Sequence, residues 1–205
     1  MIRDKIRAPI TKFIEIPIAQ LFNNIGVTPT QITIISLLIS ISGGVFVIYD
    51  NLLLGGLLFL FGSSLDLLDG TLSRLTNNST QTGALLDSVF DRLGEAFMML
   101  SLIILSLSNL EEVLTPTNIT QSSDSILIVL TVVALISSQT VSYVRARGES
   151  LNVDMKSGLI TRPERVLLIS LGLVTNYITL AVAIVALFSI VTLIQRLVNI
   201  IKALK

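Results

Sequence analysis

The stretch DLLDGTLSRLTNNSTQTGALLDSVFD, residues 66–91, places four aspartates in, or at the ends of, two apolar segments. Asp66 and Asp69 are three residues apart, and Asp87 and Asp91 are four apart, so each pair shares one face of a helix. Ionised carboxylates at membrane depth are costly and are functional candidates by default. Two antiparallel helices joined between the pairs would therefore aim four carboxylates at a common point.

The composition around this stretch is that of a membrane protein. The chain has 205 residues, 52% of them hydrophobic and 14% charged, with a mean hydropathy of +0.83. A bilayer crossing takes about 20 apolar residues, so the length permits roughly six spans and excludes a soluble α/β enzyme. The chain has no cysteine and no histidine. Disulfide frameworks, the usual zinc sites, cysteine nucleophiles and Ser-His-Asp triads are thereby excluded.

We predict an all-α integral membrane protein with six transmembrane helices. The predicted spans are roughly 31–49, 52–73, 84–108, 125–144, 163–175 and 178–200. The pair Thr175-Asn176 interrupts an otherwise uncharged stretch and indicates a turn between the last two spans. One long helix in their place is the alternative.

The distribution of charge favours six spans over five. With six spans, all fourteen Lys and Arg residues lie on one side of the membrane or in the adjoining half-helices. By the positive-inside rule, both termini and the basic loops, with the aspartates beside them, then face the cytoplasm of a multi-pass cell-membrane protein. A five-span chain would export its basic C-terminus.

Residues 1–26 form a separate unit ahead of a membrane domain at residues 27–205. Charged residues such as Arg3, Lys5 and Arg7 alternate with apolar ones. This pattern predicts an N-terminal amphipathic interfacial helix whose basic side chains lie near lipid head groups. A soluble cap packed on the helix bundle is an equally good explanation of the periodicity.

The four aspartates have the chemistry of a divalent-metal site. Hard carboxylate ligands suit one or two Mg²⁺ or Mn²⁺ ions, bound together with substrate phosphates. Gly70 and Gly83 leave room for a bulky ligand beside the helix backbone, and Arg74 can pair with a phosphate. The alternative is a structural network in which the aspartates pair with Arg74 and Arg92. The number and register of the carboxylates favour the metal site.

The same residues resemble the signature of the CDP-alcohol phosphatidyltransferases, D-x₂-D-G-x₂-A-R-x₇₋₈-G-x₃-D-x₃-D. The spacing matches throughout, and the one departure is Ser73, where alanine is usual. The resemblance implies a six-helix membrane fold over nearly the whole chain. It also implies transfer of a phosphatidyl or archaetidyl group from CDP-diacylglycerol or CDP-archaeol to an alcohol, with release of CMP. Proteins of this family are commonly homodimers, and nucleic acid is not an expected partner.

The resemblance implies roles for individual residues. Asp66, Asp69, Asp87 and Asp91 would hold the metal, and Asp91 would also act as general base on the acceptor hydroxyl. The positions implied to bind the CDP-linked lipid are Thr28, Pro29, Thr30, Gln31, Asp69, Gly70, Ser73, Arg74, Thr80, Gly83 and Asp87. Taken alone, Thr28-Pro29 is explained equally well as the start of a helix with proline in its first turn.

Five arginines predict a phosphorylated acceptor, because a guanidinium matches phosphate geometry. They are Arg145, Arg147, Arg162, Arg165 and Arg196. Basic residues at cytoplasmic helix ends also follow from topology alone. The segments around these arginines are similar to the phosphatidylinositol phosphate synthase branch, which implies inositol 1-phosphate (myo-inositol 3-phosphate) as acceptor. Thr161 departs from the glutamate usual in that branch, and glycerol 3-phosphate or serine is the alternative acceptor.

A divalent-cation transporter is the rival from a different functional class. A transport path presents carboxylates at several depths of the membrane. Here they gather in two adjacent segments near one face, and the neighbouring basic cluster would repel cations. We therefore expect a membrane enzyme.

Overall fold

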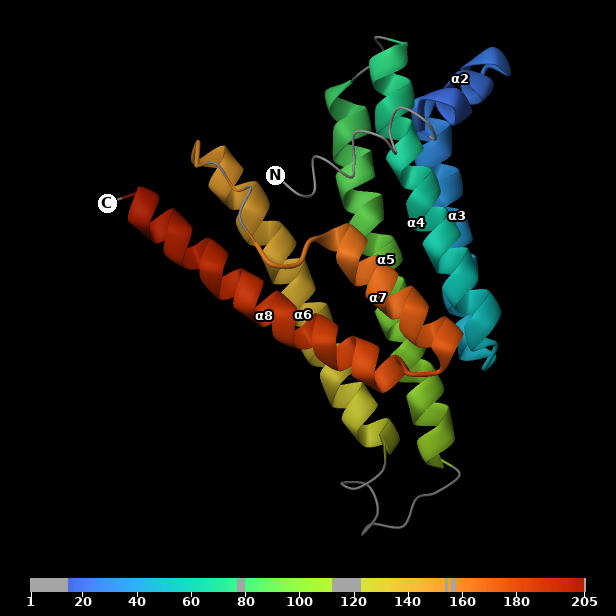
Figure 1. The fold of residues 1–205 in the computed structure, drawn as a ribbon, viewed down its shortest axis with the longest axis vertical. Helices are drawn as coiled ribbons and strands as arrows, with labels where there is room; N and C mark the ends of the chain where they lie inside the picture. Colours follow the sequence, from blue (N-terminus) through green and yellow to red (C-terminus); the bar gives the residue numbers. More distant parts are fainter. Residues whose placement is uncertain (1–14, 77–79, 112–122, 154, 156–157, 205) are drawn as a thin grey trace.

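The computed structural model describes residues 15–76, 80–111, 123–153, 155 and 158–204, and every regular element in this part of the chain is helical (Figure 1). The helices are α2 (Ile16–Asn24), α3 (Pro29–Ile48), α4 (Leu52–Leu75), α5 (Gln81–Glu111), α6 (Ser123–Ser150), α7 (Arg162–Thr175) and α8 (Ile178–Ala203). The six apolar segments of the sequence correspond to α3 through α8.

Five of these helices, α3, α4, α5, α6 and α8, are long and apolar enough to cross a membrane. Helix α7 has 14 residues. At 1.5 Å per residue it is about 21 Å long, shorter than the hydrocarbon core of about 30 Å. The protein is therefore an all-α membrane protein, and α7 falls short of the full crossing that we expected for the fifth segment.

The predicted turn between the last two helices is confirmed. Asn176 ends α7 in the left-handed conformation, with φ of 64°. Asparagine adopts this conformation more readily than most residues because its side chain is short and polar. Helix α8 then begins at Ile178, so the alternative of one long helix is wrong.

Local side-chain contacts determine where α3 and α7 begin. Thr28 and Gln31 form a reciprocal capping box, in which the Thr28 backbone N–H donates to Gln31 Oε1 at 2.9 Å. Thr161 and Glu164 repeat the arrangement at α7, with 2.8 Å from the Thr161 N–H to Glu164 Oε2. In both helices a proline follows the cap, where its missing N–H costs nothing.

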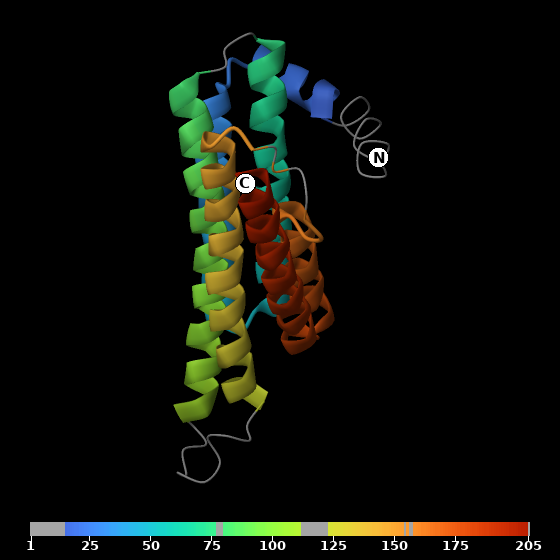
Figure 2. The ribbon, with the colours of Figure 1, turned by 90° about the vertical axis from the view of Figure 1, so that its left-hand side faces the viewer.

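Helices α3, α4 and α5 run roughly along the long axis of the molecule, and α7 and α8 form a hairpin inclined across them (Figures 1 and 2). Helix α6 leans in the same direction as α8 in Figure 1. Helix α3 packs against α4 and α5, and α4 also packs against α7. Helix α6 packs against both α5 and α8. An apolar core that includes Phe59, Met98, Leu102, Ile169 and Val182 fills the centre. The functional residues lie at the end where α4 leads into α5.

Helix α2 lies across this end of α4, and its buried Ala19 packs with Ile32 and Leu72. Leu21 and Ile25 remain exposed, at 61% and 66%. The rest of the predicted interfacial helix, with its basic residues, lies outside the described part of the chain.

Glycines allow α3 and α4 to approach closely. A Cβ on Gly43 would lie 2.8 Å from the Gly55 carbonyl oxygen and 3.0 Å from the Phe59 backbone nitrogen. Both contacts are with backbone atoms, which cannot move aside as a flexible side chain would. Gly94 of α5 differs, because a Cβ there would meet its nearest neighbour, Ser40 Cβ, at 3.5 Å, an ordinary contact.

We therefore predict that Gly43→Ala destabilises the protein and that Gly94→Ala does not. Overpacking costs about 1–3 kcal/mol, and the better helix propensity of alanine offsets about 1 kcal/mol of that cost. Thermal unfolding in detergent, followed by circular dichroism, measures the difference. Equal midpoints for the two variants would contradict the close approach of α3 and α4.

Candidate active site

Three carboxylates from two helices converge toward the basic end of the bundle. Asp66 and Asp69 of α4 are buried, and Asp87 of α5 is half-buried. One carboxylate oxygen from each lies within 4.8 Å of the other two. Such a cluster of hard oxygen ligands fits a small divalent cation such as Mg²⁺ or Mn²⁺. The predicted convergence of α4 and α5 is therefore present in the structure.

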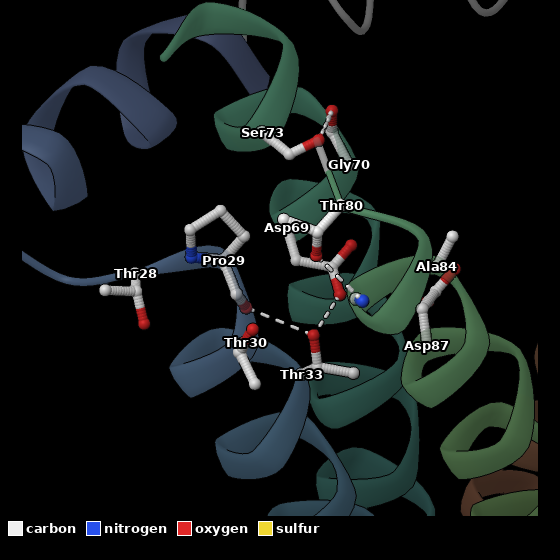
Figure 3. A pocket seen from close by; sticks show the side chains of 11 residues that line it. Thr28, Pro29, Thr30, Thr33, Asp69, Gly70, Ser73, Thr80, Ala84 and Asp87 are labelled. Carbon is white, nitrogen blue, oxygen red and sulfur yellow. Dashed lines mark hydrogen bonds between the residues drawn. The ribbon is translucent and has the colours of Figure 1, made fainter. Parts of the chain in front are cut away.

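Helix α3 supplies hydroxyl groups that hold two of these carboxylates. Thr33 Oγ1 donates to Asp69 Oδ2 at 2.5 Å (Figure 3). Ser36 Oγ lies 3.2 Å from Asp66 Oδ1. Hydrogen bonds to ligand carboxylates orient them for a metal. Neither residue was predicted from the sequence, although polar side chains three apart within an apolar segment are a usable signal.

Asp91 lies one turn beyond Asp87 on α5 and is not part of the three-carboxylate cluster among the described residues. It forms an ion pair with Arg162 Nη1. The same nitrogen donates to Asp66 Oδ2 at 3.0 Å. One guanidinium thus connects the fourth aspartate with the metal cluster, although sequence spacing alone placed all four aspartates around the metal.

Arg74 and Arg92, which the structural alternative paired with these aspartates, make other contacts. Arg74 Nη2 donates to Thr71 Oγ1 at 3.0 Å, and Thr71 also donates to the buried Glu15 at 2.9 Å. Arg92 Nη1 donates to the Ser88 carbonyl at 2.7 Å. Within the described part of the chain, the cation that pairs with Asp66 and Asp91 is Arg162, which is far from both in the sequence.

A pocket of about 380 Å³ opens beside Asp69 and Asp87, between α3, α4 and α5 (Figure 3). Its lining residues are Thr28, Pro29, Thr30, Thr33, Asp69, Gly70, Ser73, Thr80, Gly83, Ala84 and Asp87. All the predicted CDP-lipid positions except Gln31 and Arg74 are among them. Gln31 instead caps α3. Arg74 Nη1 would lie 3.5 Å from a Cβ built on Gly70, but Arg74 is not among the lining residues.

The N-termini of two helices face this first pocket. Thr28, Pro29 and Thr30 begin α3, and Thr80 accepts a hydrogen bond from the Gly83 N–H at the start of α5. Helix N-termini carry partial positive charge and favour phosphate groups. Together with a cation on the aspartates, they make the pocket suitable for a nucleotide diphosphate.

A second pocket, of about 360 Å³, lies between the ends of α5, α6, α7 and α8. Its lining residues are Asp87, Ser88, Asp91, Arg92, Glu95, Val141, Ser142, Arg145, Ala146, Glu149, Thr161, Arg162, Arg165 and Arg196. Asp87 lines both pockets. The two pockets therefore meet at α5, beside the metal cluster.

Four of the five predicted acceptor arginines line the second pocket, but they differ in exposure and in hydrogen-bond partners. Arg145 is exposed and pairs with Glu149 at 2.8 Å. Arg196 is buried and donates to the Val141 carbonyl at 2.9 Å. Arg165 is buried and bonded through two nitrogens to Glu95, a residue that the sequence analysis missed. Arg147 is exposed and is not among the lining residues.

Comparison with known proteins gives consistent relatives. Residues 26–201 match the CDP-alcohol phosphatidyltransferase family. Archaetidylinositol phosphate synthase of Pyrococcus horikoshii is 30% identical over 196 residues, covering 95% of this chain and 92% of the relative. Phosphatidylinositol phosphate synthase of Corynebacterium glutamicum is 31% identical over 199 residues, covering 94% and 85%.

Solved structures agree with the sequence relatives. Phosphatidylinositol phosphate synthase of Mycobacterium tuberculosis with CDP-DAG bound has a TM-score of 0.78 at 25% identity, covering 91% of this chain and 93% of that one. Its complex with manganese and citrate has a TM-score of 0.76 at 26% identity, covering 91% and 88%. Because the family match spans α3 to α8 and includes the converging carboxylates, this chain belongs to the CDP-alcohol phosphatidyltransferase family and is a transferase of the membrane.

Proposed function

We propose that the protein transfers a phosphatidyl or archaetidyl group from a CDP-linked lipid to the hydroxyl of an inositol phosphate, releasing CMP. The observation that carries this proposal is the meeting of two unlike pockets at Asp87. One pocket has helix N-termini and small residues beside a metal cluster, and the other is rimmed by arginines. The names of the relatives, and the CDP-DAG and manganese complexes of the mycobacterial enzyme, support the same reaction.

The first pocket binds the donor. Gly70 and Gly83 leave space beside the helix backbone, and the N-terminus of α5 faces the diphosphate. Asp66, Asp69 and Asp87 hold Mg²⁺ or Mn²⁺, which neutralises the diphosphate and polarises the reacting phosphoryl group when bound. Thr33 and Ser36 keep two of these carboxylates in place.

The second pocket binds the acceptor, with Arg145, Arg162 and Arg196 around its phosphate. Asp91 takes the proton of the attacking hydroxyl, since it lines the acceptor pocket one turn from Asp87, where the two pockets meet. The hydroxyl oxygen bonds to the lipid-linked phosphorus, the bond from that phosphorus to the CMP oxygen breaks, and CMP leaves. Arg162 holds Asp91 through their ion pair.

We further propose that both termini and the two pockets face the cytoplasm. The described basic residues lie toward one end of the helices, including Arg74, Arg147 and Lys202, whereas Asp50 and Asp124 lie toward the other. We infer that α7, although shorter than a full crossing, enters the membrane so that α8 brings the C-terminus back to the basic side, as in a six-span topology, and that α2 lies at the membrane surface. The exposed Leu21 and Ile25 of α2 support contact with lipid. A homodimer stays a prediction.

The acceptor is tested with purified protein, CDP-diacylglycerol or CDP-archaeol, Mn²⁺ and a panel of alcohols, with CMP release as the readout. We expect efficient use of inositol phosphate and poor use of inositol or serine, because an arginine pocket left without a phosphate disfavours a neutral acceptor. Preference for glycerol 3-phosphate or serine would contradict inositol phosphate as the acceptor and leave the family assignment unchanged. Mn²⁺ transport without CMP release would contradict the proposed transferase activity.

Arg145→Gln gives this experiment its residue-level test. Loss of a charge-assisted contact is worth roughly 1.5–3 kcal/mol, so the KM for inositol phosphate should rise about 10- to 100-fold. Arg147→Gln, two residues further along the same helix and outside the pocket, should leave that KM near the wild-type value. Equal effects of both substitutions would place the acceptor elsewhere.

Separate roles for the aspartates predict separate defects. Asp66→Asn should weaken Mn²⁺ binding and CDP-lipid turnover together, because a ligand of the metal is lost. Asp91→Asn should lower kcat and leave Mn²⁺ binding close to normal, because it removes the base and not a ligand. Isothermal titration and steady-state kinetics measure the two effects. Asp124→Asn, at the end of α6 far from the two pockets, is the matched control and should change neither quantity. Tight Mn²⁺ binding by Asp66→Asn would contradict the assignment of Asp66 as a metal ligand.

A further inference from the structure

Two ion pairs connect α5 with α7 in matching register. Asp91 pairs with Arg162, and Glu95 pairs with Arg165. Asp91 and Glu95 are one turn apart on α5, and the two arginines are about one turn apart on α7. The pairs are therefore two neighbouring rungs between the same two helices.

These rungs span a region where the two backbones are not in close contact. The main helix neighbours of α7 are α4 and α8, and those of α5 are α3 and α6. All four charged residues of the rungs line the second pocket. Long side chains therefore set the distance between α5 and α7 at the wall of that pocket.

The second rung has the geometry of a rigid link. Arg165 Nε lies 2.6 Å from Glu95 Oε1, and Arg165 Nη2 lies 2.8 Å from Glu95 Oε2. Both residues are only 1% exposed. A bidentate guanidinium–carboxylate pair is planar and fixes direction as well as distance. A buried pair of this kind is weak evidence for stability, so its value in this place is geometric.

We propose that Glu95 and Arg165 are positioning residues for the acceptor pocket. Their pair holds the start of α7 against α5, so that Arg162 reaches both Asp91 and Asp66. Arg165 acts through Glu95 and does not bind the acceptor phosphate itself, in contrast to the acceptor-binding role predicted from the sequence. This inference rests on the proposed function only in assigning the acceptor to the second pocket.

The first test measures the link without any substrate. The chain has no cysteine, so Leu93→Cys on α5 and Leu167→Cys on α7, 51% and 48% exposed, can be spin-labelled specifically. Labelled protein is diluted with unlabelled protein in nanodiscs, and the label-to-label distance is measured by pulsed EPR. We expect a narrow distribution that broadens in Glu95→Gln and in Arg165→Gln.

The double variant Glu95→Gln/Arg165→Gln is the control for misfolding of the single variants, because it leaves no buried charge without a partner. It should also show the broad distribution. Asp124→Asn in the same labelled background is the control and should keep the narrow one. A narrow distribution in the double variant would overturn the proposal.

The second test is a double-mutant cycle on the acceptor KM, with the alcohol that the panel selects. If the pair acts as a unit, Glu95→Gln, Arg165→Gln and the double variant raise this KM by a similar factor, about tenfold, with no change in the KM for CDP-lipid. If Arg165 bound the phosphate directly, Arg165→Gln would raise the KM while Glu95→Gln left it unchanged or lowered it. That second pattern would overturn the positioning role, whichever alcohol is the acceptor.

Discussion

The structure depends on how carboxylates are neutralised inside an apolar helix bundle. Five acidic side chains, Asp66, Asp69, Asp87, Asp91 and Glu95, gather on α4 and α5 at the basic end of the molecule. An ionised carboxylate among apolar helices is costly unless a cation or hydrogen-bond donors accompany it. Arg165 neutralises Glu95, and Arg162 contacts Asp91 and Asp66. The negative charge left at the three converging aspartates is what a divalent cation neutralises.

Helix α5 brings the two halves of the proposed reaction together. Its first turns face the donor pocket through Gly83 and Ala84, and its next turns face the arginine-rich pocket through Asp91 and Glu95. Asp87 lies between them and lines both. Because a helix is rigid over a few turns, the metal ligand, the base and the link to α7 keep fixed relative positions.

Residue spacing within a helix made the shared aspartate site and several helix boundaries predictable from the sequence. The i+3 and i+4 spacing of the aspartates predicted a shared site between α4 and α5, and the capping residues Thr28 and Thr161 mark where α3 and α7 begin. Periodicity also separates Arg145 from Arg147, since residues two apart on a helix point in different directions. Arg145 accordingly lines the second pocket and Arg147 lies outside it, although both were predicted to bind the acceptor.

The contacts between distant segments were not accessible in this way. Arg162 and Asp66 are 96 residues apart, and Arg165 and Glu95 are 70 apart. Spacing assigns each residue to a helix face but does not say which face packs against which. Thr33 and Ser36 were missed because serine and threonine in apolar helices usually bond their own backbone.

The most direct test of the central claim is an anomalous diffraction map of crystals loaded with Mn²⁺. We predict a manganese peak between α4 and α5, within coordination distance of Asp66, Asp69 and Asp87. A peak elsewhere, or none at saturating Mn²⁺, would contradict the claim that these three carboxylates form the metal site.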